Sequence, residues 1–131
     1  MYELETAGLI VRVEPTYLAH ESDPAAPRFV WAYAIEIENR TERSVQLLSR
    51  YWRITDETGI TQEVRGAGVV GEQPMIEPGE TYSYQSACPL ITPAGVMVGA
   101  YTMRDAQSDV QFDIGVPAFA LECPHAVRLA N

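Results

Sequence analysis

One stretch of the chain, residues 28–39 (RFVWAYAIEIEN), alternates large apolar side chains with small or charged ones. Phe29, Trp31, Tyr33, Ile35 and Ile37 recur at a period of two, which is typical of a β-strand with one buried face. The opposite face carries alanines and glutamates. A strand of this kind must bury its apolar face against another layer of structure. Because no stretch of ten residues shows a convincing helical period, we expect that layer to be a second sheet.

Six further segments also have the composition of strands, and turn residues separate them. Asp56-Glu57-Thr58-Gly59 and Glu77-Pro78-Gly79-Glu80 are turn signals. The pattern predicts an all-β protein, an antiparallel β-sandwich of about seven strands of the fibronectin type III or immunoglobulin-like kind. The six segments are residues 8–18, 44–56 (one long or two broken strands), 60–65, 81–87, 96–104 and 110–121.

The length of 131 residues predicts a single domain, 1–131. We expect its core to span about 8–121, because periodicity is lost after Cys123-Pro124. The segment 122–131 is therefore expected to be a loose C-terminal tail.

The charge balance excludes several classes of function. The net charge is −9 and all nine basic residues are arginine. Without lysine the chain can form neither a Schiff base nor a Walker-type phosphate site. A strongly acidic chain is a poor partner for nucleic acid or an anionic membrane. The acidic N-terminus does not resemble a secretory signal, so we expect a cytoplasmic protein with Cys88 and Cys123 as free thiols.

Residues 66–71 (GAGVVG) match the nucleotide-binding pattern G-x-G-x-x-G. That motif needs a helix directly behind it, whose N-terminus holds the pyrophosphate. Here Pro74 and Pro78 follow, and two prolines so close together cannot lie inside a continuing helix. We expect an irregular connection between strands and no nucleotide cofactor.

A narrower interpretation of this segment stays open. Consecutive glycine N–H groups can bind an anion without a helix. The guanidinium group of arginine can bind a phosphate or a carboxylate through two parallel hydrogen bonds. Two arginines lie in or near this part of the chain. The candidate anion-binding residues are Arg50, Arg65, Gly66, Gly68 and Gly71.

Neither a catalytic set nor a metal site is predicted. Ser49 and Ser86 lack the context of an activated nucleophile. His20 lies in a polar loop, and Cys123-Pro124-His125 offers two soft ligands where a structural zinc site needs four.

Several segments together resemble the ApaG family, in order and with matching spacing over roughly residues 9–121. They are residues 46–56 (QLLSRYWRITD), 63–74 (EVRGAGVVGEQP), 78–80 (PGE), 84–90 (YQSACPL), 93–101 (PAGVMVGAY) and 116–119 (VPAF).

The resemblance implies a fibronectin type III-like fold and a role connected with cobalt resistance and magnesium efflux. It also implies kinship with interaction domains of an F-box protein and of a DNA polymerase delta-interacting protein, and it brings no catalytic residues. We therefore expect a non-enzymatic binding module that acts through a protein partner. Two alternatives stay open: a binder of phosphate or pyrophosphate through Gly66–Gly71, and a direct binder of divalent metal ions through acidic loops.

Overall fold

The structure is a computed structural model that describes residues 1–124. It contains nine β-strands and one turn of 3-10 helix, η1 (Ala19–Glu21). The strands are β1 (Tyr2–Thr6), β2 (Leu9–Tyr17), β3 (Phe29–Asn39), β4 (Val45–Asp56), β5 (Thr61–Ala67), β6 (Met75–Ile76), β7 (Thr81–Leu90), β8 (Ala94–Asp105) and β9 (Gln111–Glu122).

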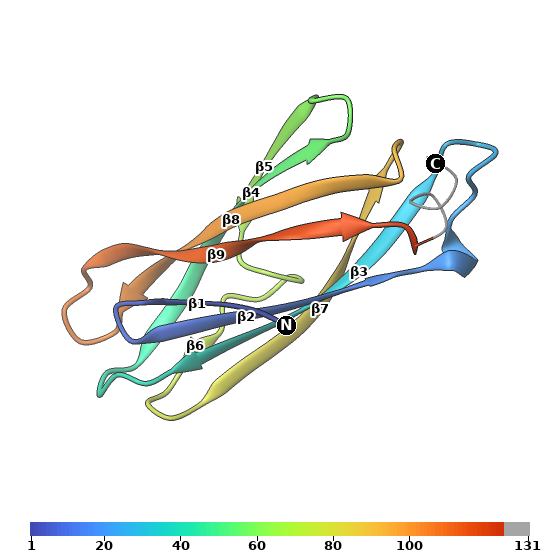
Figure 1. Cartoon of the computed structure of the whole chain (residues 1–131). Helices are drawn as coiled ribbons and strands as arrows, with labels where there is room; N and C mark the ends of the chain where they lie inside the picture. The colour runs from blue at the N-terminus through green and yellow to red at the C-terminus, as the bar shows by residue number, and fades with distance from the viewer. Residues whose placement is uncertain (125–131) are drawn as a thin grey trace.

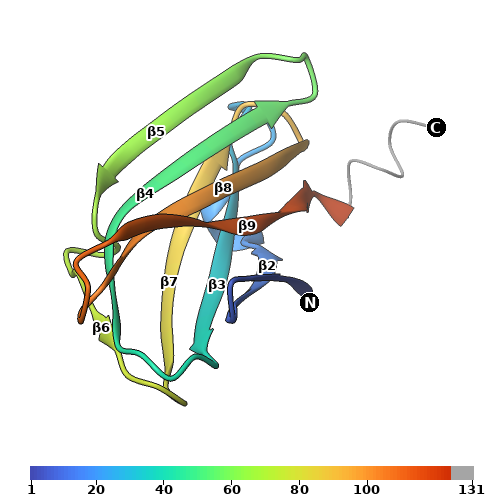
Figure 2. The same ribbon diagram turned by 90° about the vertical axis from the view of Figure 1, so that its left-hand side faces the viewer.

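The strands form two antiparallel sheets that pack face to face (Figures 1 and 2). One sheet has four strands in the order β1-β2-β3-β7. The other has five, in the order β5-β4-β8-β9, with the short β6 also paired to β4. The predicted antiparallel sandwich is confirmed, and each of the seven expected segments is a strand.

Two strands were not expected from the sequence. Most of β1 is exposed, so its residues lack the apolar alternation that reveals a half-buried strand. The two residues of β6 are too few to show any period. The structure therefore adds these two strands to the seven that the sequence predicted.

The core lies where the predicted apolar face of β3 meets the inner face of the five-stranded sheet. Trp31 is 1% exposed, and Ile35 and Ile37 are fully buried. The ring of Tyr33 meets that of Trp52 from β4 edge to face, with centroids 5.4 Å apart. Edge-to-face geometry is favoured by aromatic quadrupoles, so these rings pack the two layers in a defined orientation.

Residues 44–56 fold as one continuous strand with a bulge in it. The pairing of β4 with β8 shifts between Leu47 and Ser49, which leaves Leu48 as the extra residue. Before the bulge the odd-numbered side chains, such as Leu47, are buried; after it the even-numbered Trp52 and Ile54 are buried. An extra residue in one strand changes which side chains face the core.

One side of the sandwich is closed by β1 and β9. The hydroxyl oxygen of Thr6 accepts a hydrogen bond from the Gly115 N–H at 3.2 Å. The hydroxyl oxygen of Tyr2 accepts one from the Ala120 N–H at 3.3 Å. β1 therefore belongs to the closed side of the sandwich, although it precedes the expected core of about 8–121.

The C-terminal boundary also differs from the expectation. Glu122 is the last residue of β9, and Cys123 is 2% exposed with its N–H bonded to the Pro93 carbonyl oxygen at 2.8 Å. These two residues belong to the sandwich and not to a tail. The rest of the expected tail, from residue 125 on, lies outside the described residues.

The opposite side of the sandwich is open. Within residues 1–124, β5 packs extensively only against β4, and β7 is the edge of the other sheet. Figure 2 shows β5 as the outermost strand of its sheet. None of the helices in this range is long and apolar enough to cross a membrane.

Candidate functional site

The glycine-rich segment begins inside a strand. Gly66 and Ala67 end β5, so the expected irregular connection starts only at Gly68. Val69 and Glu72 then pair with each other around Val70 and Gly71, whose φ angles are 43° and 81°. Two positive φ angles at the centre are the mark of a type I′ turn. Within the described residues no helix follows the turn, as the two prolines predicted.

Arg50 of β4 lies directly against this segment. Its Nη1 donates hydrogen bonds to the carbonyl oxygens of Ala67 at 3.1 Å and Gly68 at 2.9 Å. A Cβ atom at position 66 would lie 2.7 Å from that same nitrogen. Gly66 is therefore the residue that lets the guanidinium lie over the end of β5.

Gly68 has a different role, which is to let the chain turn tightly. Its φ is +63°, and a Cβ there would collide with the carbonyl oxygen of Glu72. Its N–H donates to the Leu48 carbonyl oxygen at 2.8 Å, so this amide proton is already bonded within the protein. An anion site that uses the N–H groups of all three glycines would therefore lack the one from Gly68.

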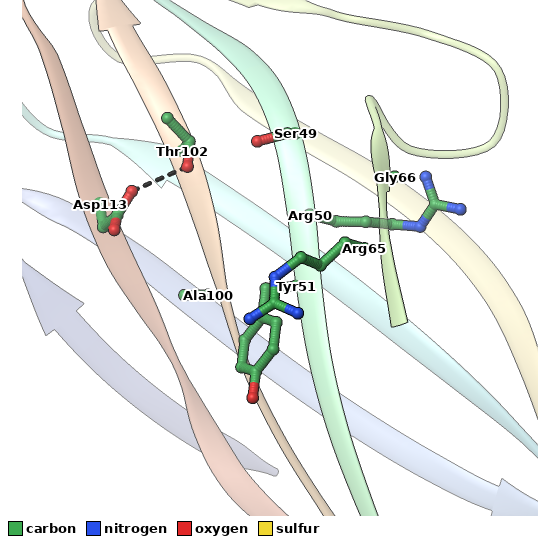
Figure 3. A pocket seen from close by; sticks show the side chains of 8 residues that line it. All are labelled: Ser49, Arg50, Tyr51, Arg65, Gly66, Ala100, Thr102 and Asp113. Carbon is green, nitrogen blue, oxygen red and sulfur yellow. Dashed lines mark hydrogen bonds between the residues drawn. The ribbon is translucent and has the colours of Figure 1, made fainter. Parts of the chain in front are cut away.

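Arg65 lies apart from Arg50. In the ladder between β4 and β5, Arg50 is opposite Gly66 and Tyr51 is opposite Arg65, and neighbouring side chains of a strand point to opposite faces. The Arg65 guanidinium lies over the Tyr51 ring, 4.6 Å from its centroid, and 3.3 Å from the Glu63 carboxylate. Figure 3 shows the two arginine side chains leaving the sheet in different directions. The guanidinium groups of Arg50 and Arg65 thus point in different directions, although Arg50, Arg65 and Gly66 all line one pocket.

The outer face around Arg65 carries a pocket of about 470 Å³ (Figure 3). Its lining brings Arg65 together with Arg50 and Gly66, and Thr102 donates a hydrogen bond to Asp113 at 2.8 Å. The Asp113 carboxylate in the same lining weakens this pocket as an anion site, because it repels the ligand that the arginines would attract.

Arg50 faces a second pocket, of about 200 Å³, on the open side of the sandwich. The hydroxyls of Tyr84 and Tyr101 are hydrogen-bonded to each other. Burial raises the pKa of both tyrosines and of Tyr33, and the positive charge of Arg50 acts in the opposite direction on all three. These hydroxyls therefore stay protonated at neutral pH. Tyr101 is joined to the pocket only through its hydrogen bond to Tyr84. The lining residues are Tyr33, Arg50, Trp52, Val69, Val70, Gly71, Tyr84 and Ser86.

The tyrosine hydroxyls and Ser86 are the part of this site that the sequence prediction missed. The tyrosines were interpreted only as core aromatics. One available signal was the choice of tyrosine over phenylalanine at inward positions, because a buried hydroxyl needs a polar partner. The sequence alone does not predict that Arg50 lies near the tyrosine hydroxyls and their polar partner.

A third pocket, of about 470 Å³, lies at the other end of the open side. It lies between the start of β5 and the end of β7, and Ile60 and Ile91 are 60% and 66% exposed. The loop before β3 completes it. Its lining residues are Ala26, Pro27, Arg28, Asp56, Ile60, Gln62, Pro89, Leu90 and Ile91.

The residues considered as metal ligands lie in different parts of the fold. His20 lies in η1 beside Glu21, with 3.6 Å between the ring Nε2 and the carboxylate. Cys88 and Cys123 are free, buried thiols. Across residues 1–124 no three His, Cys, Asp or Glu side chains are grouped so that they could hold a metal ion. His125 lies outside the described residues.

Comparison with known proteins gives the family. The model of the ApaG domain matches residues 19–105. Protein ApaG of Mesorhizobium japonicum is 52% identical, and that of Brucella canis 51%, each over the full length of both chains.

The solved structures agree with this assignment. The crystal structure of the putative ApaA protein from Bordetella pertussis superimposes with a TM-score of 0.85 at 43% identity, covering 88% of this chain and 94% of that one. The C-terminal domain of wzt, at a TM-score of 0.57 and 7% identity, covers 93% of this chain and 77% of that one, and shares only the fold. Sequence and fold together show that the chain belongs to the ApaG family.

Proposed function

We propose that the chain is a non-enzymatic interaction module whose protein partner binds the open side of the sandwich between β5 and β7. The observation that carries this proposal is the gathering of exposed apolar side chains there. Ile60, Val70 and Ile91 are each more than half exposed, around two pockets. Apolar side chains gathered around a hollow are characteristic of protein-binding surfaces.

The chemistry of the site supports binding over catalysis. Arg50 is held by two carbonyl oxygens, and such a fixed guanidinium is suited to recognition. Tyr84 and Tyr101 have their pKa values raised by burial, so neither hydroxyl is an effective base or nucleophile near neutral pH. The groups that line this pocket offer hydrogen bonds, one positive charge and apolar contact.

The family resemblance adds a cellular context to this proposal. We propose a cytoplasmic protein whose link to cobalt resistance and magnesium efflux runs through its protein partner. Direct binding of divalent ions is the competing explanation, and it makes a separate prediction. Under it, cobalt or magnesium would raise the melting temperature of the purified chain progressively as the ion concentration exceeds the dissociation constant.

Site-specific photo-crosslinking tests the proposed surface. A photoreactive amino acid at Ile91 probes the open side, and one at Val110 is the matched control, because Val110 is 59% exposed in the turn between β8 and β9. We expect Ile91 to give a saturable crosslinked product in native cytosol, competed by excess unmodified protein. Equal products at both positions, or no competition, would contradict the proposal.

A second candidate function is the binding of a small anion, phosphate or pyrophosphate, at Arg50. The observation that favours it is the position of this guanidinium in a pocket with Ser86 and the turn Val70–Gly71. Arginine binds phosphate through paired N–H groups, and such charge-assisted bonds are the strong ones.

Titration with pyrophosphate tests this second function by amide chemical shifts. We expect shifts at Val70 and Gly71, with Gly68 less affected because its N–H is bonded to Leu48. Arg50→Ala should abolish the shifts, and Arg53→Ala is the matched control because Arg53 is an exposed residue of β4 outside the linings of both pockets. Unmoved amides, or an equal effect of both substitutions, would exclude the Arg50 site.

A further inference from the structure

The edge strand β5 has main-chain groups that face away from its sheet. The Asp56 N–H donates to the Ile60 carbonyl oxygen at 3.0 Å, and the Gly68 N–H donates to the Leu48 carbonyl oxygen at 2.8 Å. Along an antiparallel strand, residues bond alternately to one side and to the other. The even-numbered residues of β5 therefore pair with β4, and the odd-numbered ones direct their N–H and C=O groups outward.

The other strand edges of the sandwich are less available. β1 and β9 lie together on the closed side, joined by the hydrogen bonds of Tyr2 and Thr6. β7 carries Pro89, which lacks an N–H group and is typical of a protected edge. β5 contains no proline, and Figure 1 shows the β4–β5 hairpin projecting from the body of the sandwich.

The side chains of β5 are complementary to a second copy of the same strand. If two copies of β5 lie antiparallel with Val64 at the centre, Glu63 of each lies opposite Arg65 of the other. Both residues are odd-numbered, so their free N–H and C=O groups meet in register. Oppositely charged side chains directly across a strand pair stabilise the pairing, and the two-fold symmetry produces the Glu63–Arg65 pair twice.

The charged groups are accessible for this pairing. The side chains of Arg65 and Glu63 are 71% and 50% exposed. Tyr51 holds both of them on the outer face, because its hydroxyl donates to Glu63 at 2.9 Å and its ring lies under the Arg65 guanidinium. Both side chains would turn from Tyr51 toward the free edge to meet the second copy.

Apolar side chains extend the complementarity along the edge. Val64 is 37% exposed and would meet Val64 of the second copy at the two-fold axis. Ile60, 60% exposed, would lie alongside the segment Gly68–Val70 of the second copy, where Val70 is 55% exposed. The same pairing thus covers three exposed apolar side chains.

We propose that two copies of the chain associate through β5, with Glu63 of each opposite Arg65 of the other, so that their five-stranded sheets join into one continuous sheet. The pairing would cover Ile60 and Val70, which also belong to the proposed partner surface. The two proposals are tested at different residues, the pairing at Glu63 and Arg65 and the partner surface at Ile91 on the β7 side.

Analytical ultracentrifugation of the full chain over a range of concentrations tests the association. We expect a reversible monomer–dimer equilibrium. Glu63→Arg and Arg65→Glu place like charges opposite each other and should each weaken the dimer about tenfold or more. The double variant Glu63→Arg/Arg65→Glu restores opposite charges and should return the dissociation constant to within about threefold of wild type. A wild-type chain that stays monomeric at all concentrations would overturn the proposal.

A matched control separates pairing from net charge. Arg40→Glu changes the net charge as Arg65→Glu does, at a position 55% exposed that follows β3 and is remote from the β5 edge. It should leave the dissociation constant unchanged. Circular dichroism on every variant checks that the fold is kept, and a folded double variant that fails to dimerise would also overturn the proposal.

Hydrogen exchange identifies the edge without any substitution. On raising the concentration, the amides of Glu63 and Arg65 should become protected, whereas those of Gln62 and Val64 should be protected at all concentrations because they bond to β4. If protection instead appears along β7, the copies associate through a different edge and the proposed pairing is wrong.

Discussion

The indole N–H of Trp31 in β3 donates a hydrogen bond to the carbonyl oxygen of Glu122 at the end of β9, 3.0 Å away. One residue belongs to each sheet, so this bond ties the two layers together near the end of the last strand. Tyr17 packs against the same indole with ring centroids 5.5 Å apart. The largest side chain of the core is thus fixed by both packing and a directional bond.

Replacing Trp31 by alanine should lower the free energy of unfolding by about 3–5 kcal/mol, because it leaves a cavity and removes the hydrogen bond to the Glu122 carbonyl oxygen. Urea denaturation measures the change. Val110→Ala, at an exposed position, should cost within about 0.5 kcal/mol and serves as the control. A loss below about 1 kcal/mol at Trp31 would mean that this face of β3 is not the core face.

Two glycines of the 66–71 segment should respond differently to alanine. Gly68→Ala should cost about 1–3 kcal/mol, since it combines a positive φ with a collision against the Glu72 carbonyl. Gly66→Ala meets only the tip of Arg50, which can move, and should cost less than about 1 kcal/mol.

The difference between the two glycines is checked by denaturation and by a double-mutant cycle. In an Arg50→Ala background, Gly66→Ala should lose most of its remaining effect, whereas Gly68→Ala should keep its cost. Equal costs for the two glycines would contradict the roles assigned to them.

Stability should fall in alkaline solution because of the buried tyrosines. Burial raises the pKa of Tyr84 and Tyr101 in the folded state, so above about pH 10 the unfolded chain loses these protons while the folded chain keeps them. The free energy of unfolding should therefore decrease as pH rises above about 10. The double variant Tyr84→Phe/Tyr101→Phe should flatten this decrease.

Urea titrations at several pH values between neutrality and pH 11 measure that slope. Tyr2→Phe removes a hydroxyl at an exposed position and serves as the control. The same slope in the double variant and in wild type would show that the tyrosine pair does not carry the alkaline sensitivity.

The thiols should be unreactive in the folded protein. Burial raises the pKa of Cys88 to about 11, so little thiolate exists at neutral pH, and Cys123 is shielded by the end of β9. Ellman's reagent should label both only after denaturation, at two thiols per chain. Rapid labelling of the native chain would contradict this burial, and fewer than two thiols after unfolding would reveal a disulfide.

Much of the fold follows from the sequence because the strands have one buried face. The alternation in residues 28–39 identified the inward side chains of β3 correctly, and the signal Asp56–Gly59 marked the turn between β4 and β5. β1 escaped prediction because its side chains are mostly exposed, and only its hydrogen bonds to β9 show why it is ordered.

The candidate site was harder to predict because it depends on three-dimensional neighbours. Arg50 and Gly66 are brought together by the hairpin, and the sequence indicated both residues. Arg65 was grouped with them because it adjoins Gly66 in the chain, although neighbouring residues of a strand point to opposite faces. Tyr84 and Tyr101 belong to different sheets, and no local pattern predicts that their hydroxyls meet.

The extra residue Leu48 makes strand length as critical as residue identity. Deleting it would place Leu47 and Trp52 on the same face of a regular strand, so the inward pattern would survive but the bulge would be lost. Its carbonyl oxygen also accepts hydrogen bonds from Gly68 and from the side chain of Gln73 at 2.8 Å each, which attach the turn to the sheet. A substitution at position 48 keeps this carbonyl acceptor. A one-residue deletion removes it, so the turn that lines the Arg50 pocket loses its attachment to the sheet.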